Sequence, residues 1–293
     1  MLIKTPTTYE EQLDILRNHG CVISDEPAAE DFLKHTGYYR LSGYFSAFRE
    51  SNVAQGRHFI QDTTFEKLAA VYNFDQELRV LILRAVSQIE LAAKSMISYH
   101  HGIEHGSLGY MDANTFNTAH NHDRFVKQFQ TAIKNNRNNK IVKHHLKNYD
   151  GDFPIWAATE LFTMGMISFF FADLKTEDKK AIAREYHTDY VHLQSWLHSA
   201  SVLRNISAHY GRLYHATFYY PPKLPRSYLK NKVLGPDSLG RQLCMLKLLH
   251  ASSKERWNST FVTPLTALIE EYGEMIDLSS MGLPADWEKL LAW

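Results

Sequence analysis

Apolar residues recur at helical spacing along most of this chain, and the longest such run lies between residues 64 and 99. Thr63 and Glu66 stand three residues apart at its start, a pattern typical of a helix N-terminus. No glycine or proline interrupts the run before Tyr99. The spacing therefore predicts one long helix that buries an apolar stripe. The stripe consists of Leu68, Val71, Tyr72, Leu78, Leu81, Ile82, Ala85, Ile89, Ala92 and Met96.

Shorter helices are expected on both sides of this long one. Thr7 and Glu10 form a candidate capping box for a helix that stops at Gly20. Pro27 suits the first turn of a second helix, which ends near Gly37. The same kind of pattern predicts further helices at 38–48 (where a strand fits almost as well), at 123–148, after Pro154, at about 177–186 and at about 191–214.

Glycine and proline mark the connections between these helices. Segment 101–118 holds three glycines and is expected to be a loop, and 221–237, which begins with Pro221, Pro222 and Pro225, is expected to be a linker or surface loop. The tail, 238–293, is predicted to add two or three helices. Strand-like alternation is scarce, so we predict an all-α helical bundle. Three regions are expected to form one compact unit: 1–60, a core at 61–220, and 221–293.

The bulk composition excludes several classes of protein. The 293 residues carry 32 Lys and Arg against 32 Asp and Glu, so the chain is not coated with positive charge. The two cysteines, Cys21 and Cys244, lie far apart in the sequence and match no metal-binding spacing. The N-terminus lacks the long apolar core of a signal peptide. The most apolar run, 161–172, is too short to span a bilayer. A cytoplasmic protein with no membrane partner is expected.

The most informative stretch is Arg204–His209, with the sequence RNISAH. If the predicted helix continues to residue 214, Asn205, His209 and Arg212 share one stripe of it. Arg204 is long enough to reach back toward the same place. The segment thus brings a permanent cation, an amide and an imidazole together.

These groups suit cleavage of RNA by its own 2′-hydroxyl. A histidine transfers protons near neutral pH, and an arginine holds two phosphate oxygens at once. We therefore predict His209 as the proton-transfer residue, Arg204 as the phosphate clamp and Asn205 as the orienting amide. The nucleophile belongs to the substrate, so no metal is required. None of the 16 histidines lies in a metal-binding motif, and no cofactor is expected.

The motif resembles the Arg-x4-His signature of the HEPN superfamily, and its longer form, 204–214, resembles the Abi-like family of bacterial abortive-infection proteins (AbiD/AbiF type). The resemblance implies a HEPN-type bundle, a ribonuclease used against phage, and a homodimer with facing motif helices. Tyr210 departs from the pattern, because many relatives have a second histidine there. Lys94 and His215 are smaller departures. Other matching segments are Gly37–Tyr44, Tyr72–Arg79, Gln88–Leu91, Pro154–Trp156 and Glu160–Phe170.

One motif supplies one histidine, whereas acid and base catalysis normally need two groups. The simplest hypothesis is therefore a homodimer with a shared cleft. His198, seven residues before Asn205, is an alternative second group, although an exposed helix histidine is the more ordinary interpretation.

Arg212 and His198 are candidate RNA contacts near the motif, and several basic side chains away from it are further candidates. Arg40 lies in an aromatic stretch whose rings either stack on bases or pack in the core. The cations of segment 124–147 have no acidic residue between them, so they form either an RNA track or a solvated helix face. The candidates in this segment are Arg124, Lys127, Lys134, Arg137, Lys140 and Lys143.

Two other functions fit the same sequence. One is a non-catalytic RNA-binding module that holds a structured non-coding RNA or neutralises a partner toxin, and Tyr210 favours it. The other is a helical interaction protein without an RNA role. RNA binding that survives loss of His209 without cleavage would favour the first of these.

Overall fold

The computed structural model describes residues 3, 5–49, 58–230 and 233–293. Over these ranges the chain is all-α, as predicted: it forms no sheet, and strand-like pairing is limited to three isolated bridges. The helices are α1 (Tyr9–Asn18), α2 (Glu26–Thr36), α3 (Tyr38–Ser42), α4 (Phe65–His105), α5 (His122–Asn135), α6 (Lys140–Asn148), α7 (Ile155–Ala158), α8 (Met164–Asp173), α9 (Thr176–Glu185), α10 (Tyr190–Ala208), α11 (Leu239–Leu249), α12 (Lys254–Trp257), α13 (Thr263–Tyr272) and α14 (Trp287–Leu291).

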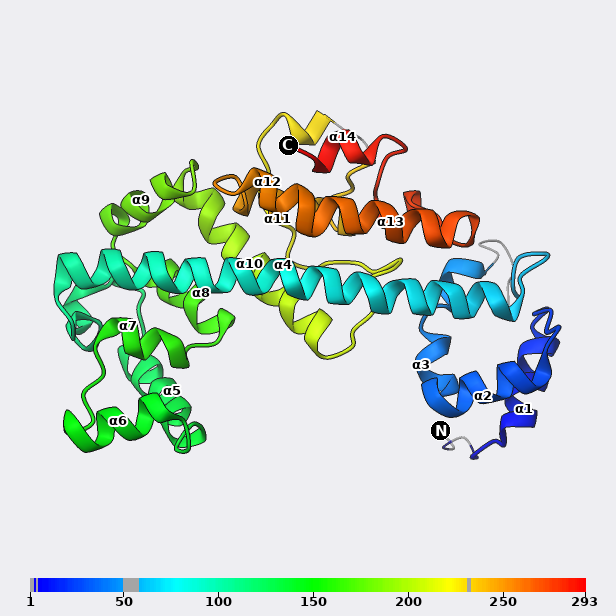
Figure 1. Cartoon of the computed structure of the whole chain (residues 1–293), viewed down its shortest axis with the longest axis horizontal. Helices are drawn as coiled ribbons and strands as arrows, with labels where there is room; N and C mark the ends of the chain where they lie inside the picture. Colours follow the sequence, from blue (N-terminus) through cyan, green and yellow to red (C-terminus); the bar gives the residue numbers. More distant parts are fainter. Residues whose placement is uncertain (1–2, 4, 50–57, 231–232) are drawn as a thin grey trace.

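Helix α4 is the axis of the molecule (Figure 1). Its 41 residues span about 60 Å at 1.5 Å per residue. It begins one residue later than expected, because Thr64 rather than Thr63 accepts the capping bond, from the Lys67 amide. It also runs to His105, beyond the expected end near Tyr99, and shortens the predicted 101–118 loop. The capping box of α1 is likewise shifted by one residue, to Thr8 and Glu11.

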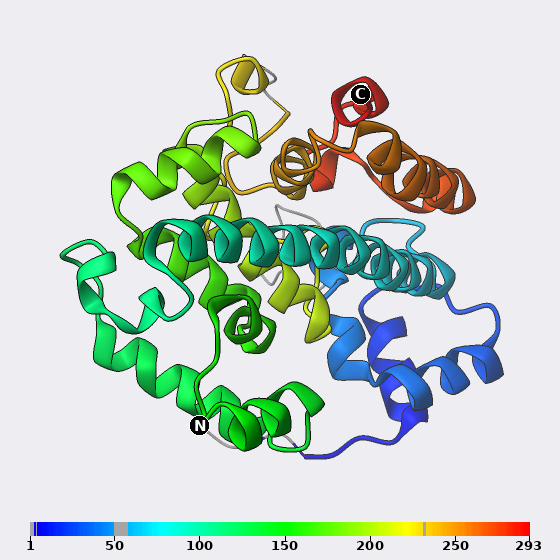
Figure 2. The same cartoon turned by 60° about the vertical axis from the view of Figure 1, so that its left-hand side comes forward.

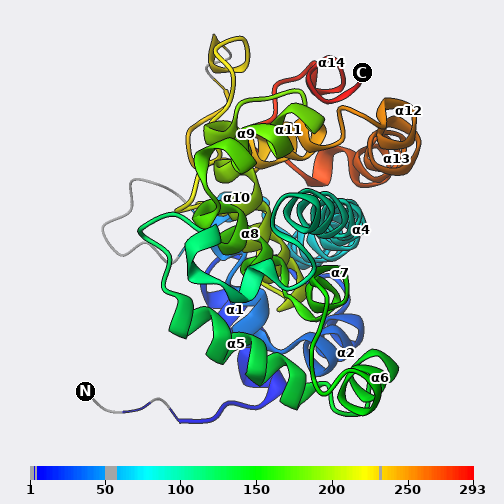
Figure 3. The same cartoon turned by 90° about the vertical axis from the view of Figure 1, so that its left-hand side faces the viewer.

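The other helices pack around α4 on several sides. In Figure 1, α1–α3 lie near one end of α4 and α5–α7 near the other, while α11–α13 run along its opposite side. Figure 2 shows the same groups after a partial turn, and Figure 3 looks nearly along α4, with α8 and α10 beside it. Helix α10 packs against both α4 and α8. It is therefore held on two sides before the motif begins.

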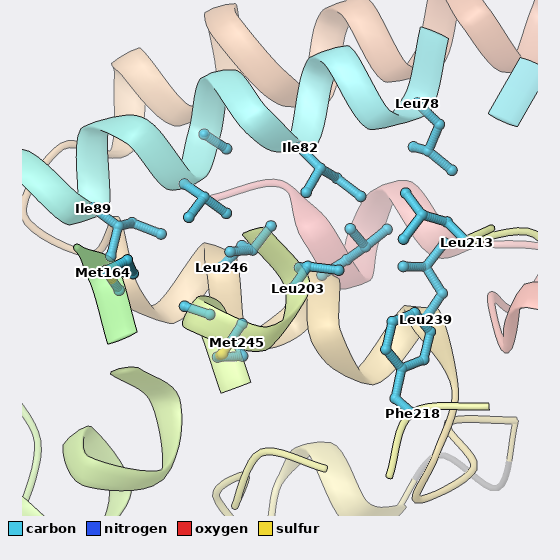
Figure 4. Packing of buried hydrophobic residues seen from close by; sticks show 14 of the residues in the cluster. Leu78, Ile82, Ile89, Met164, Leu203, Leu213, Phe218, Leu239, Met245 and Leu246 are labelled. Carbon is cyan, nitrogen blue, oxygen red and sulfur yellow. The ribbon is translucent and has the colours of Figure 1, made fainter. Parts of the chain in front are cut away.

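Buried apolar side chains of α4, α10 and α11 meet in the core next to the motif (Figure 4). Leu78 and Ile82 of α4 are buried, as are Leu203 of α10 and Leu246 of α11. Each such side chain stabilises the fold by about 1.5–3 kcal/mol on full burial. This packing sets the rotation of α10 about its axis, and so decides which of its residues face solvent.

The apolar run at 161–172 forms α8 from Met164 and is a buried helix, as expected. In the part of the chain that the structure describes, no helix is long and apolar enough to cross a membrane.

The tail also agrees with its prediction. Helices α12 and α13 join through a π-helical turn at Asn258–Val262, so the tail holds three helical stretches.

The protein is expected to lose stability in acid because His101, near the end of α4, is a buried histidine. Its ring is buried against Phe116 and Phe170, and burial together with the charge of His105 lowers its pKa to about 4. Below about pH 6.5 the unfolded chain protonates this histidine, whereas the folded protein does so only near pH 4. The folded state is therefore favoured fully above pH 6.5, and this part of its stability is lost as the pH falls from 6.5 toward 4. We expect a decrease of about 3 kcal/mol in the free energy of unfolding from this group.

Urea unfolding of the wild type and of His101→Leu at pH 7 and pH 4.5 measures this effect. The leucine variant should lose less stability on acidification, whereas His35→Ala, which removes an exposed imidazole, should behave as the wild type does. An equal acid loss in His101→Leu would contradict the assignment.

Candidate active site at the end of helix α10

Helix α10 ends at Ala208, six residues earlier than the predicted end at 214. His209 is the C-cap, and Tyr210 follows in the left-handed region at φ 59°. The Gly211 amide then donates to the Ile206 carbonyl at 2.7 Å, and the Tyr210 amide donates to Ser207 at 3.4 Å. This is the Schellman closure of a helix C-terminus, with tyrosine where glycine is usual. A bulky residue in this conformation costs about 1–2 kcal/mol, so neighbouring contacts must hold it.

The closure also requires glycine at position 211, because a side chain there would be too close to the preceding turn. A Cβ at this position would lie 2.8 Å from the Cγ2 atom of Ile206 and 3.0 Å from its carbonyl oxygen. Only glycine lets the chain pass so close to the preceding turn. Gly211, two residues after His209, therefore ends the helix within the motif itself.

The three predicted catalytic side chains lie on the solvent side of this helix end. Asn205 and His209 are exposed and Arg204 is half-buried, whereas the neighbouring Leu203 and Ser207 are buried. The Arg204 guanidinium donates to the Asn205 side-chain oxygen at 3.4 Å. The site is thus a group of polar side chains, two exposed and one half-buried, at the end of a helix that packs against α4 and α8.

The loop after the motif is held by a buried carboxylate on α4. Asp75 has no exposed surface and accepts hydrogen bonds from the amides of Leu213, at 3.1 Å, and Tyr214, at 2.7 Å. The Tyr44 hydroxyl donates to the same carboxylate at 2.6 Å. Burial raises the pKa of the Asp75 carboxyl, and these donors oppose the rise. One side chain therefore joins α4, the segment after α3 and the end of the motif.

Arg79, one turn further along α4, completes this network. Its guanidinium donates to Asp75 at 2.5 Å, to the Tyr44 hydroxyl at 3.3 Å and to the Gly211 carbonyl at 3.5 Å. Both charged side chains are almost fully buried. A buried pair of this kind needs all its partners, since an unpaired buried charge costs several kcal/mol. The network holds the loop in place because Arg79 bonds its Gly211 carbonyl and Asp75 bonds its Leu213 and Tyr214 amides.

Arg40 of α3 contacts the left-handed residue directly. Its guanidinium donates to the Tyr210 carbonyl at 3.1 Å and lies 5.7 Å from the centre of the Tyr210 ring. Arg40 therefore sits immediately beside the motif, and it helps to hold Tyr210 in its costly backbone conformation. The aromatic stretch around it divides: Tyr44 and Phe45 are core residues, while Tyr39 is exposed.

The expected position of Arg212 is wrong, because the helix ends before reaching it. Arg212 does not continue the stripe of Asn205 and His209. Its guanidinium instead bonds the Gly43 carbonyl and, at 3.0 Å, the Ser46 hydroxyl. In the structure it ties the loop to the segment after α3.

Other predicted residues lie away from this point. His198, two turns earlier on α10, packs its ring against Phe169 and Tyr220. The six predicted cations occupy exposed positions at the end of the molecule opposite α1–α3 (Figure 1); five lie on α5 and α6, and Arg137 lies in the turn between these helices. The structure therefore divides the candidate RNA contacts between the motif and a separate basic surface.

Sequence reasoning missed Tyr44, Asp75 and Arg79 as residues that position the site. An available signal was the spacing of Asp75 and Arg79, four residues apart on the apolar side of a long helix. Acidic and basic residues at such positions are rarely buried unless paired.

No group of three or more His, Cys, Asp or Glu side chains within the described ranges could hold a metal ion.

A family model for Abi-like proteins matches residues 31–215, which is more than half of the chain. This chain belongs to the Abi-like family. The match includes α3, α4 and α10, so the Abi-like region contains the motif, Arg40 and the Asp75 network. No curated protein and no solved structure is significantly similar to the chain.

Proposed function

We propose that this Abi-like protein is a metal-independent endoribonuclease of the HEPN type that acts in anti-phage abortive infection. Membership of the Abi-like family supports the defence role. The observation that carries the catalytic proposal is the group at the end of α10 in which Asn205 and His209 are exposed and Arg204 is half-buried beside them.

The proposed reaction uses the RNA itself as nucleophile. The 2′-oxygen forms a bond to the adjacent phosphorus and the bond to the 5′-oxygen breaks, leaving a 2′,3′-cyclic phosphate and a 5′-hydroxyl. His209 takes the proton of the 2′-hydroxyl or gives one to the leaving oxygen. Arg204 stabilises the extra negative charge on the phosphate, and Asn205 orients His209 or binds a phosphate oxygen.

The second proton-transfer group is proposed to come from a second copy of the chain. Each motif holds one histidine, and Tyr210 replaces the neighbouring position where many relatives have another. A homodimer with two facing motif helices would bring two His209 side chains to one cleft. The exposed position of His209 is compatible with such a shared site.

Incubation of the purified protein with total bacterial RNA in excess EDTA tests the proposal. We expect cleavage that leaves 5′-hydroxyl ends, which a polynucleotide kinase labels without prior phosphatase treatment, and 2′,3′-cyclic phosphates. Cleavage that requires a divalent metal, or that leaves 5′-phosphates, would contradict it.

A non-catalytic RNA-binding module is the second candidate function. It is favoured by Tyr210, whose carbonyl and ring are both engaged by Arg40 where a proton donor would otherwise stand. Intact RNA that co-purifies with the folded protein would support this alternative.

A further inference from the structure

Three neighbouring hollows, which share lining residues, lie between the basic surface and the motif helix, and together we call them the groove. It begins between α5 and the start of α8 as an open hollow of about 840 Å³, lined by Arg124, Lys127 and Met166. The adjoining hollow shares Arg124 and Met166 with it and extends to Phe169. A third hollow begins at Phe169 and ends at His198 of α10 and Lys223. The groove thus runs from α5 across α8 to α10.

Three cations, Arg124, Lys127 and Lys223, and two carboxylates, Asp123 and Asp173, line this path. No ion pair between described residues involves Arg124, Lys127 or Lys223, nor the other cations of α5 and α6. No acidic residue occurs between Arg124 and Tyr149. In a chain whose formal net charge is zero, this is a local excess of positive charge. Such an excess fits a polyanion that follows the groove.

An aromatic ring lies at the middle of the groove. Phe169 is 58% exposed, although the next two residues of α8, Phe170 and Phe171, are buried. The His198 ring lies 6.1 Å from it, centre to centre. An exposed ring within a groove offers a stacking surface for an unpaired base, which a base inside a duplex cannot use. Side-chain amides, including Asn121, Gln128 and Asn135, line the first hollow and can bond base edges.

We propose that this groove binds single-stranded RNA, with phosphates on Arg124, Lys127 and Lys223 and one base stacked on Phe169. The inference rests on the proposed function, from which it takes RNA as the ligand. His198 is the α10 residue of the third hollow that lies nearest to the motif along the helix, seven residues before Asn205 or about 10 Å along the helix axis, so the groove passes beside the helix that carries the motif. His198 then belongs to the strand path rather than to the proton transfer.

Binding measured in a His209→Ala background, where cleavage cannot interfere, tests the groove. The probes are a fluorescent 20-nucleotide RNA of mixed sequence and the same RNA annealed to its complement. We expect Phe169→Ala to weaken binding of the single strand by about 5- to 150-fold, the usual range for one stacked base. Lys127→Ala should reduce the slope of log affinity against log salt by about one.

Two variants serve as controls. Tyr99→Ala removes another exposed aromatic ring, on α4, and Lys289→Ala removes an exposed cation on α14. Both should bind as the parent does. Circular dichroism of every variant verifies that the fold is kept.

The outcomes separate this inference from the nuclease proposal. Single-strand binding that depends on Phe169 and Lys127 supports the groove even if the wild type cuts no RNA. Cleavage by the wild type with binding unaffected by Phe169→Ala and Lys127→Ala would overturn the groove and leave the nuclease standing. The groove proposal would also be overturned if the duplex bound as tightly as the single strand and Phe169→Ala did not change its binding.

Discussion

Replacement of His209 by alanine is expected to lower RNA cleavage by about 10²- to 10⁴-fold, the usual contribution of a proton-transfer side chain. The side chain is exposed, and the turn around it is closed by backbone bonds and by the Asp75 network, so the fold should survive. Arg204→Ala should lose about 10²- to 10³-fold, as on removal of one donor to a developing oxyanion. Arg204→Lys should fall between, because an ammonium keeps the charge but not the paired donors.

Initial rates on a fluorogenic RNA measure these losses, with His35→Ala on α2 as a control that removes an exposed imidazole elsewhere. A dimer of one wild-type and one His209→Ala chain, isolated with two different tags, tests the shared cleft. If both histidines act in one site, its activity should be below about a tenth of the wild type. Half of the wild-type activity would mean that each copy works alone. A loss in His198→Ala as large as in His209→Ala would place the second group on the same chain.

Replacement of Asp75 by alanine is expected to destabilise the protein by about 3–5 kcal/mol. The variant leaves the Arg79 charge buried without its partner and also leaves the amides of Leu213 and Tyr214 without an acceptor. Urea unfolding measures the loss. Glu77→Ala, two residues along the same helix and exposed, should change the free energy of unfolding by less than about 0.5 kcal/mol.

Asp75→Asn separates the role of the charge from that of the shape. The amide is similar in size but does not neutralise Arg79, so we expect a clear loss of stability here too. At a temperature where this variant is still folded, we also expect weaker cleavage, because the loop that follows His209 loses its anchor. Stability and cleavage equal to those of Glu77→Ala would show that the network does not position the motif.

Most helices of this protein were predictable because their signals are local. The stripe from Leu68 to Met96 requires burial along a helix whatever covers it, and α4 is indeed helical over that range. The charged helix near 177–186 and the basic segment at 123–148 are also helical, the latter divided at Asn136. The aromatic stretch 38–48, where strand and helix both fitted, became a short helix and a 3₁₀ turn.

The end of the motif helix was not predictable from periodicity. Residues 209–214 keep apolar and basic residues at plausible spacing, but Gly211 closes the helix onto Ile206 and the chain leaves it. The direction that the chain then takes depends on Asp75, which lies 138 residues before Leu213. Residue spacing along the helix therefore placed Asn205 and His209 correctly on the solvent side and misplaced Arg212.

By itself, the sequence determined the all-α class, most of the helices, and the Arg204, Asn205 and His209 group, because these depend on residue types at short, regular spacing. The tertiary structure alone decided what surrounds that group. It brought Arg40 to Tyr210, buried Asp75 and Arg79 beneath the loop, and joined the basic surface of α5 to α10 through Phe169. These contacts link residues far apart in the chain. They form because burying the apolar faces of α3, α4, α8 and α10 together leaves one arrangement in which the buried charges are also paired.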